Sequence, residues 1–189
     1  MRIPDLMKKL KRGPQIITLK DAAIISAFTG MSPGDSVVDA GAGSGFLSVY
    51  MGNIVKPGKV ISYERRPEFA EIARKNVKKA GLEKIVDIKD KDIYEGIDEN
   101  DVDVVTLDLP EPWNAVAHAK KALKTGGYAV AYVPSVEQFR KFVRECEKSG
   151  MLHEKTVECT VREMVVKERG TRPQIKGLMH TGYISFCRK

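Results

Sequence analysis

A carboxylate and a glycine-rich turn follow one short apolar run. Residues 37–45 read Val-Val-Asp-Ala-Gly-Ala-Gly-Ser-Gly. Glycine lets a ligand approach the backbone closely, and the carboxylate of Asp39 can accept a hydrogen bond from an ammonium group. A dinucleotide-binding turn has the spacing G-x-G-x-x-G, whereas single residues separate the glycines of this turn. The tighter turn leaves less room for a diphosphate and suits an amino-acid moiety, with a purely structural turn as the alternative.

An acidic residue also ends the next apolar run. Glu64 follows Gly45 by about 20 residues, a distance that places an acid at the carboxyl end of the neighbouring strand. There it can accept hydrogen bonds from both hydroxyls of a ribose. An ion pair with Arg65 or Arg66 is the structural alternative. Because Arg65 is a cation next to Glu64, a ligand with a 2′-phosphate, such as NADP, also remains an alternative on charge alone. Together with the glycine turn, Glu64 favours a nucleoside ligand.

Two later carboxylates follow apolar runs in the same way. Asp92 can accept a hydrogen bond from an adenine amino group, or it belongs to an ordinary solvated turn. Asp108 follows the buried run 102–107, so we expect it at the carboxyl edge of the sheet, where substrates of such folds bind. Prolines stiffen the loop after it, and Trp113 offers a stacking face or an apolar lid. The alternative for Asp108 is a helix cap.

Alternating strands and helices position these residues and predict a parallel α/β sheet. The expected strands are 36–40, 59–63, 85–88, 102–107 and 128–133. The expected helices are 20–28, 45–54, 67–80, 115–123 and 135–148. Two terminal strands, 156–168 and 181–187, are separated by a long loop and predict an antiparallel hairpin at a sheet edge. The expected organisation is one domain over 1–189, with a lead-in segment 1–19, a βα core 20–150 and a hairpin region 151–189.

The composition indicates which partners and which cellular location to expect. The 189 residues include 32 Lys and Arg against 25 Asp and Glu, a net charge of +7. This balance is typical of proteins with an anionic partner such as nucleic acid, or of a solvated lysine-rich surface. No apolar run approaches the roughly 20 residues of a spanning helix, and the N-terminus lacks the apolar core of a secretory signal. A cytoplasmic protein without membrane contact is expected.

The cysteines do not indicate a metal site. Cys146, Cys159 and Cys187 are scattered, without the spacing of metal ligands. We therefore expect no metal. Burial as small apolar side chains is the expectation, and a disulfide stays open as an alternative.

Several phrases, taken in order, resemble the tRNA adenine-N1 methyltransferases. They are residues 12–17 with 20–21, 41–45, 62–64, 91–94, 108–113 and 180–183. The first, fifth and last are the most specific, and the resemblance covers essentially the whole chain. Leu19 stands where the family commonly has proline. Members usually carry a small N-terminal β-domain that helps to dock tRNA, and we expect it to be absent from this chain.

The resemblance implies a fold and a cofactor. The fold is the α/β class I methyltransferase fold, Rossmann-like and dependent on S-adenosylmethionine (SAM), with S-adenosylhomocysteine as product. Its seven-stranded, mostly parallel sheet has the order 3-2-1-4-5-7-6 and a C-terminal antiparallel hairpin. The implied cofactor-binding residues are Gln15, Ile17, Asp39, Gly41, Gly43, Ser44, Gly45, Phe46, Leu47, Glu64, Asp92, Ile93 and Asp108.

The implied activity is methylation at N1 of adenine 58, and also of adenine 57 in archaeal members, in the T-loop of tRNA. Asp108 is the implied catalytic residue, since a carboxylate accepting from the exocyclic amine stabilises the charge that methylation puts on the ring. The base must be extruded to be reached. Candidates to receive it are Trp113, Arg169, Arg172, His180 and Tyr183, with a structural hairpin role equally open for His180. A homotetramer is implied by the resemblance only.

Two other functions remain as alternatives. Small corrinoid-precursor methyltransferases have a similar length and lack the β-domain, but the phrases at 108–113 and 180–183 argue against them. An inactive RNA-binding partner subunit should lose the glycine turn and the catalytic aspartate. Both features stand in this sequence.

Overall fold

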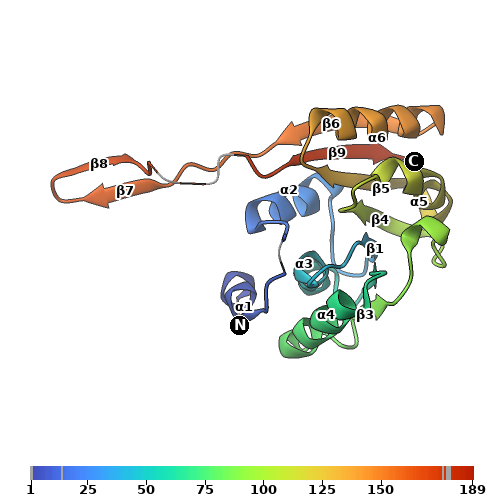
Figure 1. The fold of residues 1–189 in the computed structure, drawn as a ribbon, viewed down its shortest axis with the longest axis horizontal. Coiled ribbons are helices and arrows are strands. Elements are labelled where there is room, and N and C mark those ends of the chain that lie inside the picture. Colours follow the sequence, from blue (N-terminus) through green and yellow to red (C-terminus); the bar gives the residue numbers. More distant parts are fainter. Residues whose placement is uncertain (1, 14, 176, 178–179) are drawn as a thin grey trace.

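The computed structural model describes residues 2–13, 15–175, 177 and 180–189. A seven-stranded sheet forms the centre of the fold (Figure 1). Its strands, in order across the sheet, are β3 (Val86–Lys89), β2 (Lys59–Tyr63), β1 (Ser36–Ala40), β4 (Val102–Leu107), β5 (Leu123–Val133), β9 (Tyr183–Arg188) and β6 (Leu152–Glu158). Strands β1 to β5 are parallel, and β9 runs antiparallel to both β5 and β6. The predicted strand order and fold class are confirmed, with β9 as the seventh strand.

Helices cover both faces of this sheet, as a parallel sheet requires. They are α1 (Ile3–Lys9), α2 (Leu19–Thr29), α3 (Phe46–Val55), α4 (Pro67–Ala80), α5 (Val116–Ala122) and α6 (Val136–Lys148), with the short 3₁₀ helices η1 (Ile93–Glu95) and η2 (Pro112–Ala115). In the described part of the chain no helix has the length and apolarity to span a membrane.

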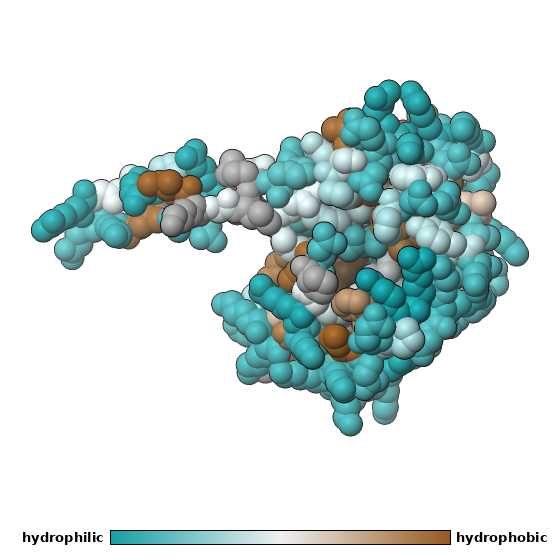
Figure 2. Space-filling model, in the orientation of Figure 1, coloured by the Kyte–Doolittle hydropathy of each residue, from teal (hydrophilic) through white to brown (hydrophobic). Residues whose placement is uncertain are grey.

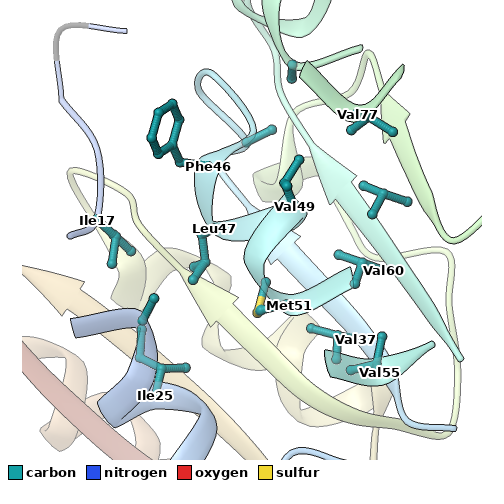
Figure 3. Packing of buried hydrophobic residues seen from close by; sticks show 14 of the residues in the cluster. Ile17, Ile25, Val37, Phe46, Leu47, Val49, Met51, Val55, Val60 and Val77 are labelled. Atoms are coloured by element: carbon teal, nitrogen blue, oxygen red, sulfur yellow. The ribbon is translucent and has the colours of Figure 1, made fainter. Parts of the chain in front are cut away.

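Two apolar clusters form, one on each face of the sheet. Neighbouring residues of β1 point to opposite faces, so Val37 joins the first cluster and Val38 the second. Figure 3 shows the first cluster, in which side chains of α3 such as Met51 pack on the sheet. The second cluster contains Phe142 and Cys146 of α6. Cys146 and Cys187 are buried as predicted, and the cysteines are free thiols.

The predicted boundary between α5 and β5 is wrong. The helix ends at Ala122, and β5 begins at Leu123, five residues before the predicted start of the strand, and continues through Gly126 and Gly127. Leu123 pairs with Val102, and the register shifts before the next pair. Gly127 packs so closely on Asp103 that an added Cβ would lie 2.9 Å from its carbonyl oxygen. The glycines therefore serve a strand irregularity rather than a turn.

The prediction of one long strand over 156–168 is also wrong. Strand β6 ends at Glu158, and residues further on form β7 (Met164–Lys167), which pairs with β8 (Gly170–Pro173) in a separate two-stranded ribbon. The ribbon extends away from the body of the protein (Figure 1). Its apolar side chains lie on its surface (Figure 2), and Val166 is 77% exposed. The alternating pattern identified strands correctly, but it does not reveal whether a strand joins the main sheet.

Hydrogen bonds from Lys20 fix α2 to the C-terminal hairpin region. Lys20 donates from Nζ to the carboxylate of Asp21 at 2.7 Å, to the Cys159 carbonyl at 2.5 Å and to the Thr181 hydroxyl at 2.6 Å. Asp21 is fully buried. Beside Thr181, Gly182 lies against Tyr132, whose ring would be 2.7 Å from an added Cβ. The phrases at 20–21 and 180–183 therefore meet in space as one structural joint.

We predict that Ile184→Ala destabilises the protein by about 2–5 kcal/mol, because it leaves a cavity in the core. Ile184 lies in β9 and is fully buried. Leu152→Ala on the neighbouring strand is the control, since Leu152 is 64% exposed; it should cost no more than about 0.5 kcal/mol. Urea unfolding measures both. Equal losses would contradict the assignment of β9 to the core.

Candidate active site

A hollow of about 290 Å³, open to solvent, lies at the carboxyl ends of β1 and β4. Its lining residues are Gln15, Ile16, Ile17, Gly41, Ala42, Gly43, Ser44, Phe46, Leu47 and Asp108. Most of the predicted cofactor-binding residues are thus brought together, and sequence reasoning missed Ile16 and Ala42, which lie between predicted residues. Figure 3 shows Ile17, Phe46 and Leu47 on neighbouring segments. Pro14, in the first of the phrases, lies outside the described residues.

The glycine turn forms one wall of the hollow. Gly43 and Gly45 have φ angles of 52° and 75°, which favour glycine. Gly45 precedes the first residue of α3, and an added Cβ would lie 3.1 Å from Ala73 of α4. The tight turn predicted from the spacing is confirmed. It requires glycine both for its conformation and for the close packing of α4 behind it.

Asp108 is fixed by the backbone at the ends of β1 and β4. Its N–H donates to the Ala40 carbonyl at 2.5 Å, and its carbonyl accepts from the Gly41 N–H at 3.3 Å. Asp108 keeps an exposed surface toward the hollow, while many protein atoms lie around its carboxylate. Burial, together with the charges of Asp39 and Glu64, raises the pKa of Asp108 to about 7. A carboxylate of this kind can change its protonation state near neutral pH.

Asp39 is buried among protein hydroxyls at the end of β1. It is 1% exposed, and its carboxylate accepts hydrogen bonds at 2.7 Å from the hydroxyls of Ser48, Ser62 and Thr106. Burial raises its pKa, while these hydroxyls oppose the shift. The expected hydrogen bond from a ligand's ammonium group stays a prediction; in the structure the hydrogen bonds to this carboxylate come from α3, β2 and β4.

Glu64 lies under the glycine turn. It is 4% exposed, and Oε2 accepts a hydrogen bond from the Gly43 N–H at 2.8 Å. Its other oxygen accepts from the Arg66 backbone N–H at 3.1 Å and from the Arg66 guanidinium at 3.2 Å. The ion pair weighed as the structural alternative is present. Contact with a ribose stays a prediction, and Glu64 adjoins the lining of the hollow through Gly43.

Three other predicted site residues, Asp92, Ile93 and Trp113, lie outside the lining of the hollow. Asp92 caps η1 by accepting from the Tyr94 N–H at 3.0 Å, and it pairs with Arg65 at 3.3 Å. Ile93 is 2% exposed and packs in the second apolar cluster, so only its backbone is free to meet a ligand. Trp113, in η2, is half-buried beneath the ammonium group of Lys141, which lies 4.8 Å from its ring centre.

His180 makes contacts that hold the C-terminal hairpin in place, which is the structural alternative to a role in receiving the base. Its Nδ1 lies 2.5 Å from the Glu158 carboxylate and its Nε2 lies 3.2 Å from the Pro134 carbonyl. The hydrogen bond with Glu158 raises the pKa of His180. Its ring lies 4.9 Å from that of Tyr183, which in turn packs against Phe139. These contacts join the hairpin to the loop before α6.

The two arginines expected beside the hollow are on the ribbon instead. Arg169 is in the turn between β7 and β8, and Arg172 is in β8. Both are exposed, and the ribbon extends away from the body (Figure 1). Neither arginine is among the residues that line the hollow, because the segment 164–173 forms its own pair of strands, so their role in receiving the base stays a prediction.

The hollow fits a ligand with polar and apolar parts. The Ser44 hydroxyl is buried and has no hydrogen-bond partner in the described part of the protein. Such a group is costly unless it meets a polar partner. Apolar side chains from Ile17 and Leu47 line the same space. In the described residues no cluster of His, Cys, Asp and Glu is placed to hold a metal ion. These features suit an organic cofactor such as SAM.

We predict that Asp108→Asn stabilises the protein increasingly as pH rises. Because the pKa of Asp108 is raised to about 7, the folded state keeps a proton that the unfolded state loses above about pH 4. The free energy of unfolding therefore falls between about pH 4 and 7 in the wild type, and asparagine removes this loss. The melting temperature should favour the variant little at pH 4 and most at pH 8.

Asp98→Asn is the matched control with the opposite sign. Hydrogen bonds from Lys91 and Lys89 lower the pKa of Asp98, so its charge stabilises the folded state at all pH values above about 4. This variant should have a lower melting temperature at pH 8. A pH-independent difference for Asp108→Asn would contradict the electrostatic description of the hollow.

A family model described as "tRNA methyltransferase complex GCD14 subunit" matches residues 3–177. The tRNA (adenine(57)-N(1)/adenine(58)-N(1))-methyltransferase TrmI of Methanocaldococcus jannaschii is 40% identical over 211 residues, which cover 97% of this chain and 75% of that protein. Two solved structures are also similar. The SAM-dependent O-methyltransferase from Thermotoga maritima has a TM-score of 0.94 at 34% identity, covering 100% of this chain and 71% of the other.

The second structure is the tRNA (m1A58) methyltransferase TrmI from Aquifex aeolicus, with a TM-score of 0.90 at 25% identity, covering 100% of this chain and 76% of the other. These likenesses agree with the fold and the strand order of the sheet. Because the family model spans most of the chain and a relative is 40% identical over nearly all of it, the chain belongs to the family of tRNA adenine-N1 methyltransferases.

Proposed function

We propose that this enzyme transfers a methyl group from SAM to N1 of adenine 58 in the T-loop of tRNA, with adenine 57 as a second target. The observation that carries the proposal is the position of Asp108, which lines the same hollow as the glycine turn. A group that contacts the acceptor base and the segment that holds the cofactor must share one space for methyl transfer. Relatives in the family have names that specify these two positions.

Different residues around the hollow would bind the cofactor and contact the adenine. SAM, when bound, supplies a methyl group on a positively charged sulfonium. Gln15, Ile17 and the turn from Gly41 to Leu47 would hold it, and Glu64 would meet its ribose. Asp108 accepts a hydrogen bond from the exocyclic amine of adenine, which stabilises positive charge on the ring. Asp108 must be ionised for this role, and a nearby cation favours ionisation by lowering its pKa.

Basic residues near the hollow support tRNA as the partner. Lys8, Lys9, Lys11 and Arg12 are all exposed, and they directly precede the segment that lines the hollow. Lysine and arginine at such a position can contact phosphates. The enzyme would act in the cytoplasm, where tRNA is found.

The ribbon supports assembly into a homo-oligomer, and the tetramer is proposed from the family resemblance. Met164, Val166 and Ile175 are 55%, 77% and 80% exposed. Apolar side chains gathered on one projecting element are typical of a surface covered by another chain. In such an assembly Arg169 and Arg172 would lie near a neighbouring subunit and could still contact tRNA.

The competing substrates are distinguished by the atom that receives the methyl group. The family match argues against a corrinoid precursor, and relatives that are named catalytic subunits argue against an inactive partner subunit. One similar structure is named as an O-methyltransferase, so oxygen is the acceptor to exclude. Nucleoside analysis of unmodified tRNA after incubation with SAM should show 1-methyladenosine in the T-loop. A 2′-O-methylated nucleoside instead would overturn the proposed function.

We predict that Asp108→Ala lowers the turnover number on tRNA by about 100-fold or more, because one electrostatic stabiliser of the transition state is lost. SAM affinity should change little, since other residues hold the cofactor. Single-turnover kinetics and calorimetry measure the two quantities separately. Wild-type turnover in a variant that binds SAM normally would rule out the proposed role of Asp108.

We predict that Glu64→Ala weakens SAM binding by about 2 kcal/mol or more, because charge-assisted hydrogen bonds are lost. Glu99→Ala is the control. Glu99 is a carboxylate near the same sheet edge, but it binds Lys89 and the Tyr63 hydroxyl rather than the glycine turn. Calorimetry at one temperature compares the variants. Equal affinities for Glu64→Ala and the wild type would remove Glu64 from the cofactor site.

A further inference from the structure

One wall of the hollow is a segment without regular structure. Residues 11–13 and 15–17, which we name the strap, lie between α1 and α2 and contribute Gln15, Ile16 and Ile17 to the lining. The glycine turn lines the hollow with Gly41 to Leu47. The width of the hollow therefore depends on how the strap is held against this turn.

A single buried side chain binds the backbone of both walls. Asn76 of α4 is 2% exposed, and its Nδ2 donates to the Lys11 carbonyl at 2.8 Å and to the Ser44 carbonyl at 2.7 Å. Its Oδ1 accepts from the Lys11 N–H at 2.9 Å. Both N–H groups and the carbonyl of the amide are used. The strap and the glycine turn thus share one fastening point on α4.

Other contacts place the strap close to the turn. An added Cβ at Gly13 would lie 3.4 Å from the Ser44 side chain, so the two segments are in near contact. The Arg12 guanidinium lies 6.0 Å from the ring centre of Phe46. In the described part of residues 12–17, no backbone group makes a hydrogen bond to the rest of the protein. Asn76 therefore anchors the N-terminal end of the strap at Lys11, while Thr18 anchors its other end to α2 through Asp21 and Ala22.

We propose that Asn76 is a positioning residue for the cofactor hollow: it sets the distance between the strap and the glycine turn without touching the ligand. The proposal rests on the proposed function only in naming SAM as the occupant. An asparagine that merely stabilised α4 would affect unfolding, but it would not change cofactor affinity or the exposure of the strap. These readouts separate the two roles.

The main test is Asn76→Asp, which has nearly the same shape. Its carboxylate can still accept from the Lys11 N–H, but it faces the carbonyls of Lys11 and Ser44 without donors. We expect SAM to bind at least 10-fold more weakly by calorimetry. The KM for SAM should rise while kcat at saturating SAM stays near the wild-type value. Hydrogen exchange in peptides covering residues 11–17 should accelerate.

Asn53→Ala is the matched control. Asn53 lies on α3 and its Nδ2 donates to the Val49 carbonyl of its own helix at 2.9 Å. It removes a helix asparagine with no bond to either wall, so affinity and exchange at the strap should stay unchanged. A loss of SAM affinity in Asn53→Ala as large as in Asn76→Asp would overturn the specific role of Asn76.

Gly13→Val provides a second variant, needed if Asn76→Asp does not fold. The valine would push the strap away from Ser44 and leave Asn76 intact, so SAM affinity should again fall. A folded Asn76→Asp, or failing that a Gly13→Val, that binds SAM within twofold of the wild type overturns the proposal. A wild-type protein that binds no SAM overturns the proposed function instead, and exchange at the strap then decides whether Asn76 fastens it.

Discussion

Three carboxylates, those of Asp39, Glu64 and Asp108, lie at the carboxyl ends of neighbouring strands. They repel one another when ionised, so the fold must stabilise their negative charges. The structure supplies donors to two of them. The carboxylate of Asp39 accepts hydrogen bonds from three hydroxyls, and that of Glu64 accepts hydrogen bonds from N–H groups of Gly43 and Arg66. Among the described residues, no donor is directed at the carboxylate of Asp108. Burial, together with the charges of Asp39 and Glu64, raises its pKa to about 7 with no hydrogen bond from the described residues to oppose the shift, and the carboxylate is left free to meet a substrate.

The elements around the hollow follow from this arrangement. The donors to Asp39 come from α3, β2 and β4, so three elements must meet beneath the turn. Gly45 lets α4 approach the turn, and α4 brings Asn76 to the point where the strap and the turn meet. A cationic cofactor would lower the cost of the clustered charge, because an opposite charge stabilises ionised carboxylates. Binding and the electrostatics of the site are thus coupled.

The sequence predicted the elements better than the partners of individual side chains. Apolar runs located most of the strands, and the spacing of glycines located the tight turn, whereas the order of the strands and most of the residues that line the hollow came from the resemblance to a family. Spacing placed Asp39 at the right strand end but did not show that three hydroxyls from distant segments would enclose it. Asn76 escaped notice because a single asparagine inside an amphipathic helix carries no local signal. The ribbon was misjudged because alternation indicates a strand but not the sheet to which it belongs.

The ionisation of Asp108 tests this account most directly. Titration of the ¹³C-labelled aspartate carboxyls by NMR, with Asp108→Asn to assign the signal, gives its pKa in the free protein and with ligands. The account predicts a midpoint near pH 7 in the free protein. SAM, which carries a positive charge, should lower that midpoint, and uncharged S-adenosylhomocysteine should lower it less. A midpoint near the ordinary value of about 4, unchanged by SAM, would contradict the clustered-carboxylate site.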